Sequence, residues 1–164
     1  MDSSHGFDDQ LSALLPRLRR FAHGLSRSSA DADDLAQMTV ERALRSRDQW
    51  QPGTRLDSWT YRIMRNLWID STRSRTRKER VEAPAEEGDS VGQDPTAAIA
   101  ASIDLQRIMT AMDGLPAEQR EVVALILIEG FGYREAAEIL GLPIGTVASR
   151  LVRGRTALLA MVGE

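Results

Sequence analysis

The sequence predicts an all-α protein, built as two small helical domains joined by a flexible acidic linker. Apolar residues recur at helical spacing from about residue 7 to 80 and again from about 97 to 162, with almost no alternating strand pattern. The stretch between them is acidic, rich in Pro, Gly, Ala and Ser, and without periodicity, which is typical of a linker. We therefore expect a first domain over 7–80, a linker over 81–96 and a second domain over 97–162.

The first domain should contain a helix with one apolar and one polar side, beginning near Asp31, whose side chain can cap its N-terminus. Asp33 and Asp34 then lie in the first turn, where the helix dipole favours negative charge. The apolar side carries Ala36, Val40, Ala43 and Leu44, and the polar side carries Asp34, Gln37, Glu41 and Arg45. The polar side is either a solvated face or a contact surface. No partner ligands accompany the acidic trio, so no metal site is expected.

The next predicted helix, from about Ser58, has an unusual second side. Trp59, Ile63 and Leu67 fall on one side, as expected for a core, and Asn66 and Asp70 project nearer to that packed side. The opposite side carries Tyr61, Arg65, Trp68, Thr72 and Arg75. Arginine neutralises phosphate and an aromatic ring stacks on an unpaired base, so this side suits single-stranded nucleic acid. The alternative is that Trp68 packs against a neighbouring helix or a partner protein.

The segment from Gln49 to Arg55 contains a Pro-Gly pair and connects these two helices. Loops of this kind can hold an extruded base, but more often they only reverse the chain.

The second domain carries a pattern typical of a helix-turn-helix between Gly130 and Arg155: a short helix, a glycine-proline turn and a basic helix. On the second helix, Val147, Leu151, Gly154 and Leu158 should pack inward, and Ser149, Val152 and Arg153 should project outward beside Ala148. We expect base-edge contacts from the outward group and phosphate contacts from Arg150 and Arg155. Thr146 could hold a phosphate or cap the helix. The alternative is a merely solvated basic face.

Composition restricts the function further. The net charge is −3, but cations cluster locally at Arg73, Arg75, Arg77, Lys78 and Arg80 and again at Arg150, Arg153 and Arg155. Phosphate affinity depends on this local density, so the acidic total does not exclude nucleic acid. The chain has no cysteine and only two histidines, which excludes disulfides and gives no sign of a metal site or catalytic triad. No cofactor is expected, and no apolar run is long enough to span a membrane.

With both domains considered, the chain resembles bacterial RNA polymerase sigma factors of the extracytoplasmic-function type. The resemblance depends on residues 33–40, on 58–66 with Asp70, on 115–123 and on 145–151. It implies a cytoplasmic, non-enzymatic initiation factor, stress-responsive and controlled by an anti-sigma factor. Family members often carry a basic residue where this chain has Ala148, so no base or phosphate contact is expected from that position.

The resemblance also implies roles for individual residues. The first domain is expected to bind the beta-prime clamp helices of core RNA polymerase through Asp34, Leu35, Gln37, Met38 and Glu41, and the beta flap is a further expected contact. Recognition and melting of the minus-ten promoter element would involve Trp50, Thr54, Arg55, Tyr61, Arg65, Asn66, Trp68, Asp70 and Arg73. The duplex minus-thirty-five element would be read by Thr146, Ser149, Arg150, Val152, Arg153 and Arg155.

Three other functions account for parts of the sequence. A sigma-like mimic or adaptor that binds anti-sigma factors should lose the basic promoter-facing helix, which this chain keeps. A stand-alone helix-turn-helix regulator explains the second domain equally well, but gives no reason for the tryptophan-arginine helix of the first. An enzyme is disfavoured because no nucleophile, metal cluster or phosphate loop is evident.

Overall fold

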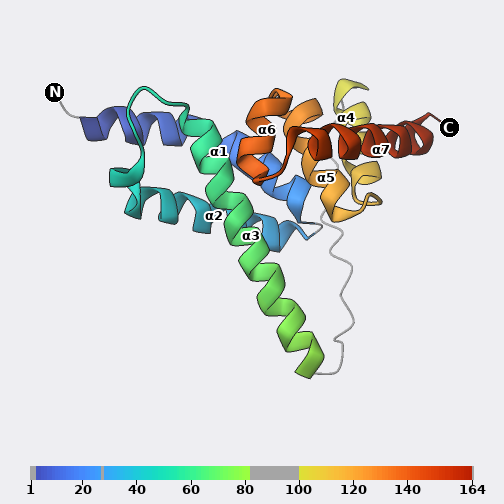
Figure 1. Cartoon of the computed structure of the whole chain (residues 1–164), viewed down its shortest axis with the longest axis horizontal. Coiled ribbons are helices and arrows are strands. Elements are labelled where there is room, and N and C mark those ends of the chain that lie inside the picture. Colours follow the sequence, from blue (N-terminus) through green and yellow to red (C-terminus); the bar gives the residue numbers. More distant parts are fainter. Residues whose placement is uncertain (1–2, 27, 82–99, 164) are drawn as a thin grey trace.

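In a computed structural model of the chain, two helical units lie side by side (Figure 1). The structure describes residues 3–26, 28–81 and 100–163. The first unit contains α1 (Ser3–Leu25), α2 (Ser29–Arg45), a 3-10 helix η1 (Arg47–Gln49) and α3 (Leu56–Val81). The second contains α4 (Ala100–Met112), α5 (Ala117–Val123), a π-helical segment η2 (Ala124–Ile128), α6 (Tyr133–Leu140) and α7 (Ile144–Val162). The prediction of two all-α domains is confirmed. The expected linker, apart from Val81, lies outside the described residues.

Helix α2 has the two different sides that its sequence predicts. Ala36 and Ala43 are buried against the core, and Asp34, Gln37, Glu41 and Arg45 are exposed. Leu44 is the exception, since 39% of it is exposed. The expected cap is also wrong: Ser28 caps the helix, because its hydroxyl accepts the backbone N–H of Asp31 at 3.4 Å. Asp31 itself lies in the first turn of the helix.

The second unit is organised around α7, which packs along α5, α4 and α6. Helix α6 ends at Gly141, whose left-handed conformation (φ +66°) lets the chain turn without a Cβ penalty. Pro143 then precedes α7, so the predicted glycine-proline turn is confirmed. The four residues expected to face inward are buried: Val147, Leu151, Gly154 and Leu158.

The two units share one continuous hydrophobic core. Helix α1 contacts α5 and η2, and α3 contacts α6. The approach of α1 to η2 is close, because a Cβ added at Gly24 would lie 3.1 Å from the Cβ of Ala124. Across the described ranges, no helix is both long and apolar enough to cross a membrane.

Replacing Gly154 with alanine is expected to lower the free energy of unfolding by about 1–3 kcal/mol, because an added methyl group forces its packed neighbours to shift. A Cβ at this position would lie 2.8 Å from Cγ2 of Val123, a fully buried and stiff β-branched side chain. Gly145→Ala is the control on the same helix, since nothing lies within 4 Å of an added Cβ there. Its stability should stay level or rise by up to about 1 kcal/mol. Urea unfolding measures both variants, and equal loss in the two would contradict the packing argument.

Candidate nucleic-acid and polymerase interfaces

Helix α7 presents the expected outward group to solvent. Ser149, Val152 and Arg153 are exposed, and Val152 has 65% of its surface free although it is apolar. Arg155 is also exposed, whereas Thr146 and Ala148 are half-buried. The opposite side of the helix is packed, so the outward group sits on a rigid support.

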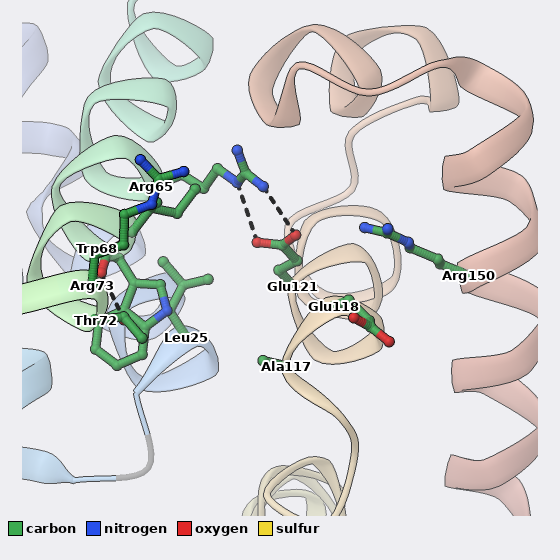
Figure 2. A pocket seen from close by; sticks show the side chains of 10 residues that line it. Leu25, Arg65, Trp68, Thr72, Arg73, Ala117, Glu118, Glu121 and Arg150 are labelled. Carbon is green, nitrogen blue, oxygen red and sulfur yellow. Dashed lines mark hydrogen bonds and ion pairs between the residues drawn. The ribbon is translucent and has the colours of Figure 1, made fainter. Parts of the chain in front are cut away.

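Arg150 is half-buried and extends from α7 toward α5 (Figure 2). There it borders a groove of about 540 Å³ that runs between the two units. The groove is lined by Leu25, Arg65, Trp68, Ile69, Thr72, Arg73, Ala117, Glu118, Glu121 and Arg150. One edge of the predicted duplex-reading helix therefore adjoins the predicted single-strand face of α3.

The prediction that Tyr61 faces outward is wrong. The side chain is fully buried, with its ring 4.8 Å from that of Phe21 and 5.2 Å from that of Phe131. Its hydroxyl donates a hydrogen bond of 3.0 Å to Glu129. Phe131 and Glu129 belong to the second unit, so this side of α3 is covered by a neighbour far away in the sequence.

Arg65 and Trp68 lie on the same side of α3 and are also drawn into the contact between the units. Arg65 donates hydrogen bonds to both carboxylate oxygens of Glu121, at 3.3 and 3.4 Å, as Figure 2 shows. Trp68 is half-buried and lines the groove. This position agrees better with packing against a neighbouring helix than with a fully exposed nucleic-acid surface. Thr72 and Arg73 remain exposed, and the side chain of Arg75 lies outside the described residues.

Asn66 and Asp70 are exposed, so the expectation that they project toward the packed side is wrong. Together with Arg42 and Gln49 they border a cavity of about 180 Å³ between α2 and α3. The apolar floor of this cavity comes from Trp59, Ile63 and Leu67, which pack partly buried against the core as expected. Two polar side chains of α3 thus flank an open hollow on the side away from the second unit.

The loop before α3 is held at both ends. The half-buried Trp50 ring lies 5.5 Å from that of Phe7, and its indole N–H has no acceptor among the described residues. Gly53 adopts a positive φ of 92°, and the exposed Thr54 donates from its hydroxyl to the Gln51 carbonyl at 2.6 Å. Arg55 is exposed. The loop therefore offers Thr54 and Arg55 at the surface, whereas Trp50 anchors it to α1.

Arg55 also takes part in a charged cluster. It donates to both oxygens of Asp57, at 3.1 and 2.8 Å, and forms an ion pair with Glu135 of α6. Burial favours a raised pKa for Asp57, but hydrogen bonds from Arg55 and from the Ser58 N–H outweigh it and hold that pKa below its ordinary value. The carboxylate consequently stays charged and keeps Arg55 oriented toward the second unit.

A buried carboxylate links the two units most directly. The Glu129 side chain is 0% exposed and accepts hydrogen bonds from Arg20 at 2.7 and 2.8 Å and from Tyr61. Arg17 approaches it to 3.7 Å. Burial, followed by the charge of Glu129, raises the pKa of Tyr61 well above its ordinary range, and the hydrogen bond to Glu129 raises the pKa of Arg20.

Arg120 is a second buried charge that sequence reasoning did not single out. Its guanidinium donates to the carbonyls of Gly24 and Leu25, at the C-terminus of α1, and to that of Leu115. A cation suits the negative end of a helix dipole, so Arg120 holds α1 from the other unit. Charged residues beside the apolar run 122–128 were the available signal, since charges next to a buried stretch are usually paired.

The expected polymerase surface on α2 is mostly accessible. Asp34, Gln37 and Glu41 are exposed, and Met38 has 44% of its surface free. Leu35 is only 4% exposed and packs in the core behind this surface, so it offers little area for the contact that the resemblance implies. Beside the surface lies a hollow of about 640 Å³, lined by Leu15, Arg19, Asp33, Ala36, Gln37, Val40 and Glu41.

Two family models match the chain. Residues 11–78 match Sigma-70 region 2, and residues 105–158 match Sigma-70, region 4. The chain is 38% identical over 154 residues to the ECF RNA polymerase sigma factor EcfG of Rhodopseudomonas palustris, covering 94% of this chain and 83% of that protein. It is 40% identical over 158 residues to the ECF RNA polymerase sigma factor SigE of Mycolicibacterium smegmatis, and the match covers 93% of this chain and 60% of SigE.

Two solved structures are similar over nearly the whole chain. The sigma factor RpoE, in complex with the anti-sigma factor NepR from Bartonella quintana, has a TM-score of 0.85 and 33% identity, covering 96% of this chain and 97% of that one. CnrH, in complex with the cytosolic domain of CnrY, has a TM-score of 0.69 and 25% identity, and the match covers 98% of this chain and 90% of CnrH. In the part of the chain described here, no group of three metal-binding side chains gathers.

The buried Tyr61 hydroxyl should make stability fall at high pH. Because its folded pKa is raised, the stabilisation is complete below the unfolded value, about 10, and is lost as pH rises above it, where only the unfolded chain ionises. Tyr61→Phe should remove this decline. Tyr133→Phe, which alters the other tyrosine at an exposed site, should retain it. Unfolding measured between about pH 9 and 12 tests this, since the chain has a single lysine, Lys78, to titrate in the same range. Parallel pH profiles for the parent and Tyr61→Phe would contradict it.

Proposed function

The chain belongs to the extracytoplasmic-function group of RNA polymerase sigma factors, and on that premise we propose the residues through which it directs core polymerase to a set of promoters. The observation that carries the assignment is the α7 surface, where Ser149, Val152 and Arg153 are exposed over a packed opposite side. Initiation by a sigma factor needs no chemistry from the chain itself, because polymerase supplies it.

Duplex DNA is bound by α7. A helix in the major groove contacts base edges with its outward side chains and phosphates with the flanking ones. Ser149, Val152 and Arg153 take the base-reading positions, with Arg155, Arg150 and Thr146 at phosphates. The exposed Val152 supports this assignment, because an apolar side chain in the groove suits a thymine methyl group.

The opened strand of the minus-ten element is bound by the first domain. The hollow beside Asn66 and Asp70, together with Thr54 in the preceding loop, offers donors and acceptors to an extruded base, and Arg55 adds a phosphate contact once it leaves Glu135. Extruding a base costs a few kcal/mol, which stacking and edge contacts must offset. Arg73 is exposed one turn further along α3 and suits a neighbouring phosphate. Tyr61, Arg65 and Trp68 can join this contact only after the second domain has moved away.

Core polymerase is bound by α2. Asp34, Gln37 and Glu41 form an exposed polar stripe beside the half-exposed Met38. An apolar side chain ringed by polar ones is typical of a protein interface, and the hollow between α1 and α2 gives it depth. Both solved relatives are complexes, one with an anti-sigma factor and one with the cytosolic domain of CnrY, and we infer that this chain too is held by an anti-sigma factor.

A run-off transcription assay with core polymerase tests the function and the reading helix together. The purified chain should give promoter-specific initiation, and its absence would overturn the proposed function. Arg153→Ala should weaken duplex binding and change base preference by about 1–3 kcal/mol, the typical contribution of a bidentate base contact. Arg107→Ala, which removes an exposed arginine from α4 of the same domain, is the control and should leave preference unaltered. An unchanged preference in Arg153→Ala would mean that Arg153 does not read bases.

Met38→Lys should reduce affinity for core polymerase by about tenfold or more, since a central apolar contact typically contributes 1–2 kcal/mol or above. Binding to minus-thirty-five duplex should not change, because α2 and α7 lie in different domains. Leu44→Lys is the control, as this exposed residue of α2 projects from another side of the helix. If both variants bind polymerase equally well, the contact lies elsewhere.

A further inference from the structure

Three carboxylates of the second domain hold arginines of the first. Glu121 accepts from Arg65, Glu135 pairs with Arg55, and Glu129 accepts from Arg20. They come from α5, α6 and the residue directly after η2. The second domain therefore presents a row of negative groups along α1 and α3 of the first.

Two of the arginines held in this way belong to the surface proposed to bind the opened promoter strand. A carboxylate gives a guanidinium the same pair of charged oxygen acceptors as a phosphate. Glu121 uses both of its oxygens toward Arg65, as a phosphate would (Figure 2). Arg55 and Arg65 therefore cannot engage DNA and the second domain together.

An aromatic ring completes the likeness to a nucleic acid. Phe131 packs edge-on against Tyr61 at 5.2 Å, and the guanidinium carbons of Arg55 and Arg17 lie 5.1 and 5.9 Å from the centre of its ring. Aromatic side chains and arginine planes are also groups with which proteins hold an unpaired base. Phe131 lies between Tyr61 and Arg55, in edge contact with the tyrosine ring and with the guanidinium over its face.

We propose that the second domain is an intramolecular mimic of single-stranded DNA, which covers part of the first domain's promoter surface until nucleic acid displaces it. This inference rests on the function proposed above. The exchange is favourable in principle because each arginine-carboxylate pair lost on opening can be replaced by an arginine-phosphate pair. The side of α3 with Asn66 and Asp70 is not covered in the closed form, so DNA can make its first contact there.

The absence of native cysteines allows a direct test on the full chain. Arg45→Cys and Ala160→Cys place donor and acceptor dyes at exposed positions, one in each domain, and energy transfer reports closure. The test variant carries Glu121→Gln, Glu129→Gln and Glu135→Gln, which keep the side-chain shapes and remove the charges. The matched control removes three charges from exposed positions away from the contact between the domains: Asp9→Asn, Asp48→Asn and Glu138→Gln.

The test variant should lose energy transfer in the absence of DNA and bind fluorescent oligothymidylate about tenfold more tightly than the parent, because binding is weakened by the fraction of the chain that is closed. The control should remain closed and gain little affinity at the same salt concentration. Glu135 is partly exposed, so Glu135→Gln alone should not disturb folding. This single variant should lower energy transfer and raise oligothymidylate affinity, each by a smaller factor than the triple variant.

A test variant that stays closed would overturn the proposal. So would one that opens but binds the oligonucleotide no better than the matched control. Run-off transcription by the same preparations separates this failure from a failure of the proposed function: initiation that persists would leave the sigma assignment standing, whereas loss of initiation in the parent chain would remove it.

Discussion

The buried carboxylate of Glu129 is the interaction on which the arrangement of the two domains depends. A charge removed from water costs several kcal/mol unless close partners replace its hydration. Here the side chain has no exposed surface, and its partners Arg20, Arg17 and Tyr61 all belong to the other domain. The π-helical segment η2 directly precedes it, and its wider turn changes the direction in which the following residues leave the helix. Separating the domains therefore requires water to reach Glu129 and its partners at once.

This constraint gives α3 two different neighbours. One side packs on α2 within the first domain, and the other is covered by Phe131, Glu129 and Glu121 of the second. The stripe with Asn66 and Asp70 remains open between them, and Thr72 and Arg73 are exposed further along the helix. The contact between the domains therefore decides which sides of α3 are accessible.

The same constraint separates what the sequence could predict from what it could not. Helices α2 and α7 each have one packed side, so apolar spacing was enough to place Ala36, Val147 and Leu151 inside and Gln37 and Arg153 outside. Helix α3 defeated that reasoning, because a periodicity argument assumes that a helix has a single packed side. Tyr61 was assigned to solvent because its spacing places it opposite Trp59 and Ile63, and Leu35 was assigned to a contact through resemblance although its spacing is that of a core residue. Phe21 of the first domain covers part of the Tyr61 ring, but its partners in the second domain lie about seventy residues away, a distance at which spacing carries no information.

The close packing at Gly154 has a consequence for promoter architecture. Because Gly154 has no side chain, α7 packs directly on Val123 and Gln119 of α5, so α5 joins α7 to the contacts that Arg120 and Glu121 make with the first domain. In the opening proposed above, the second domain is therefore expected to move as one body. On the proposed function, the reading helix then keeps the same shape at every spacing between the two promoter elements.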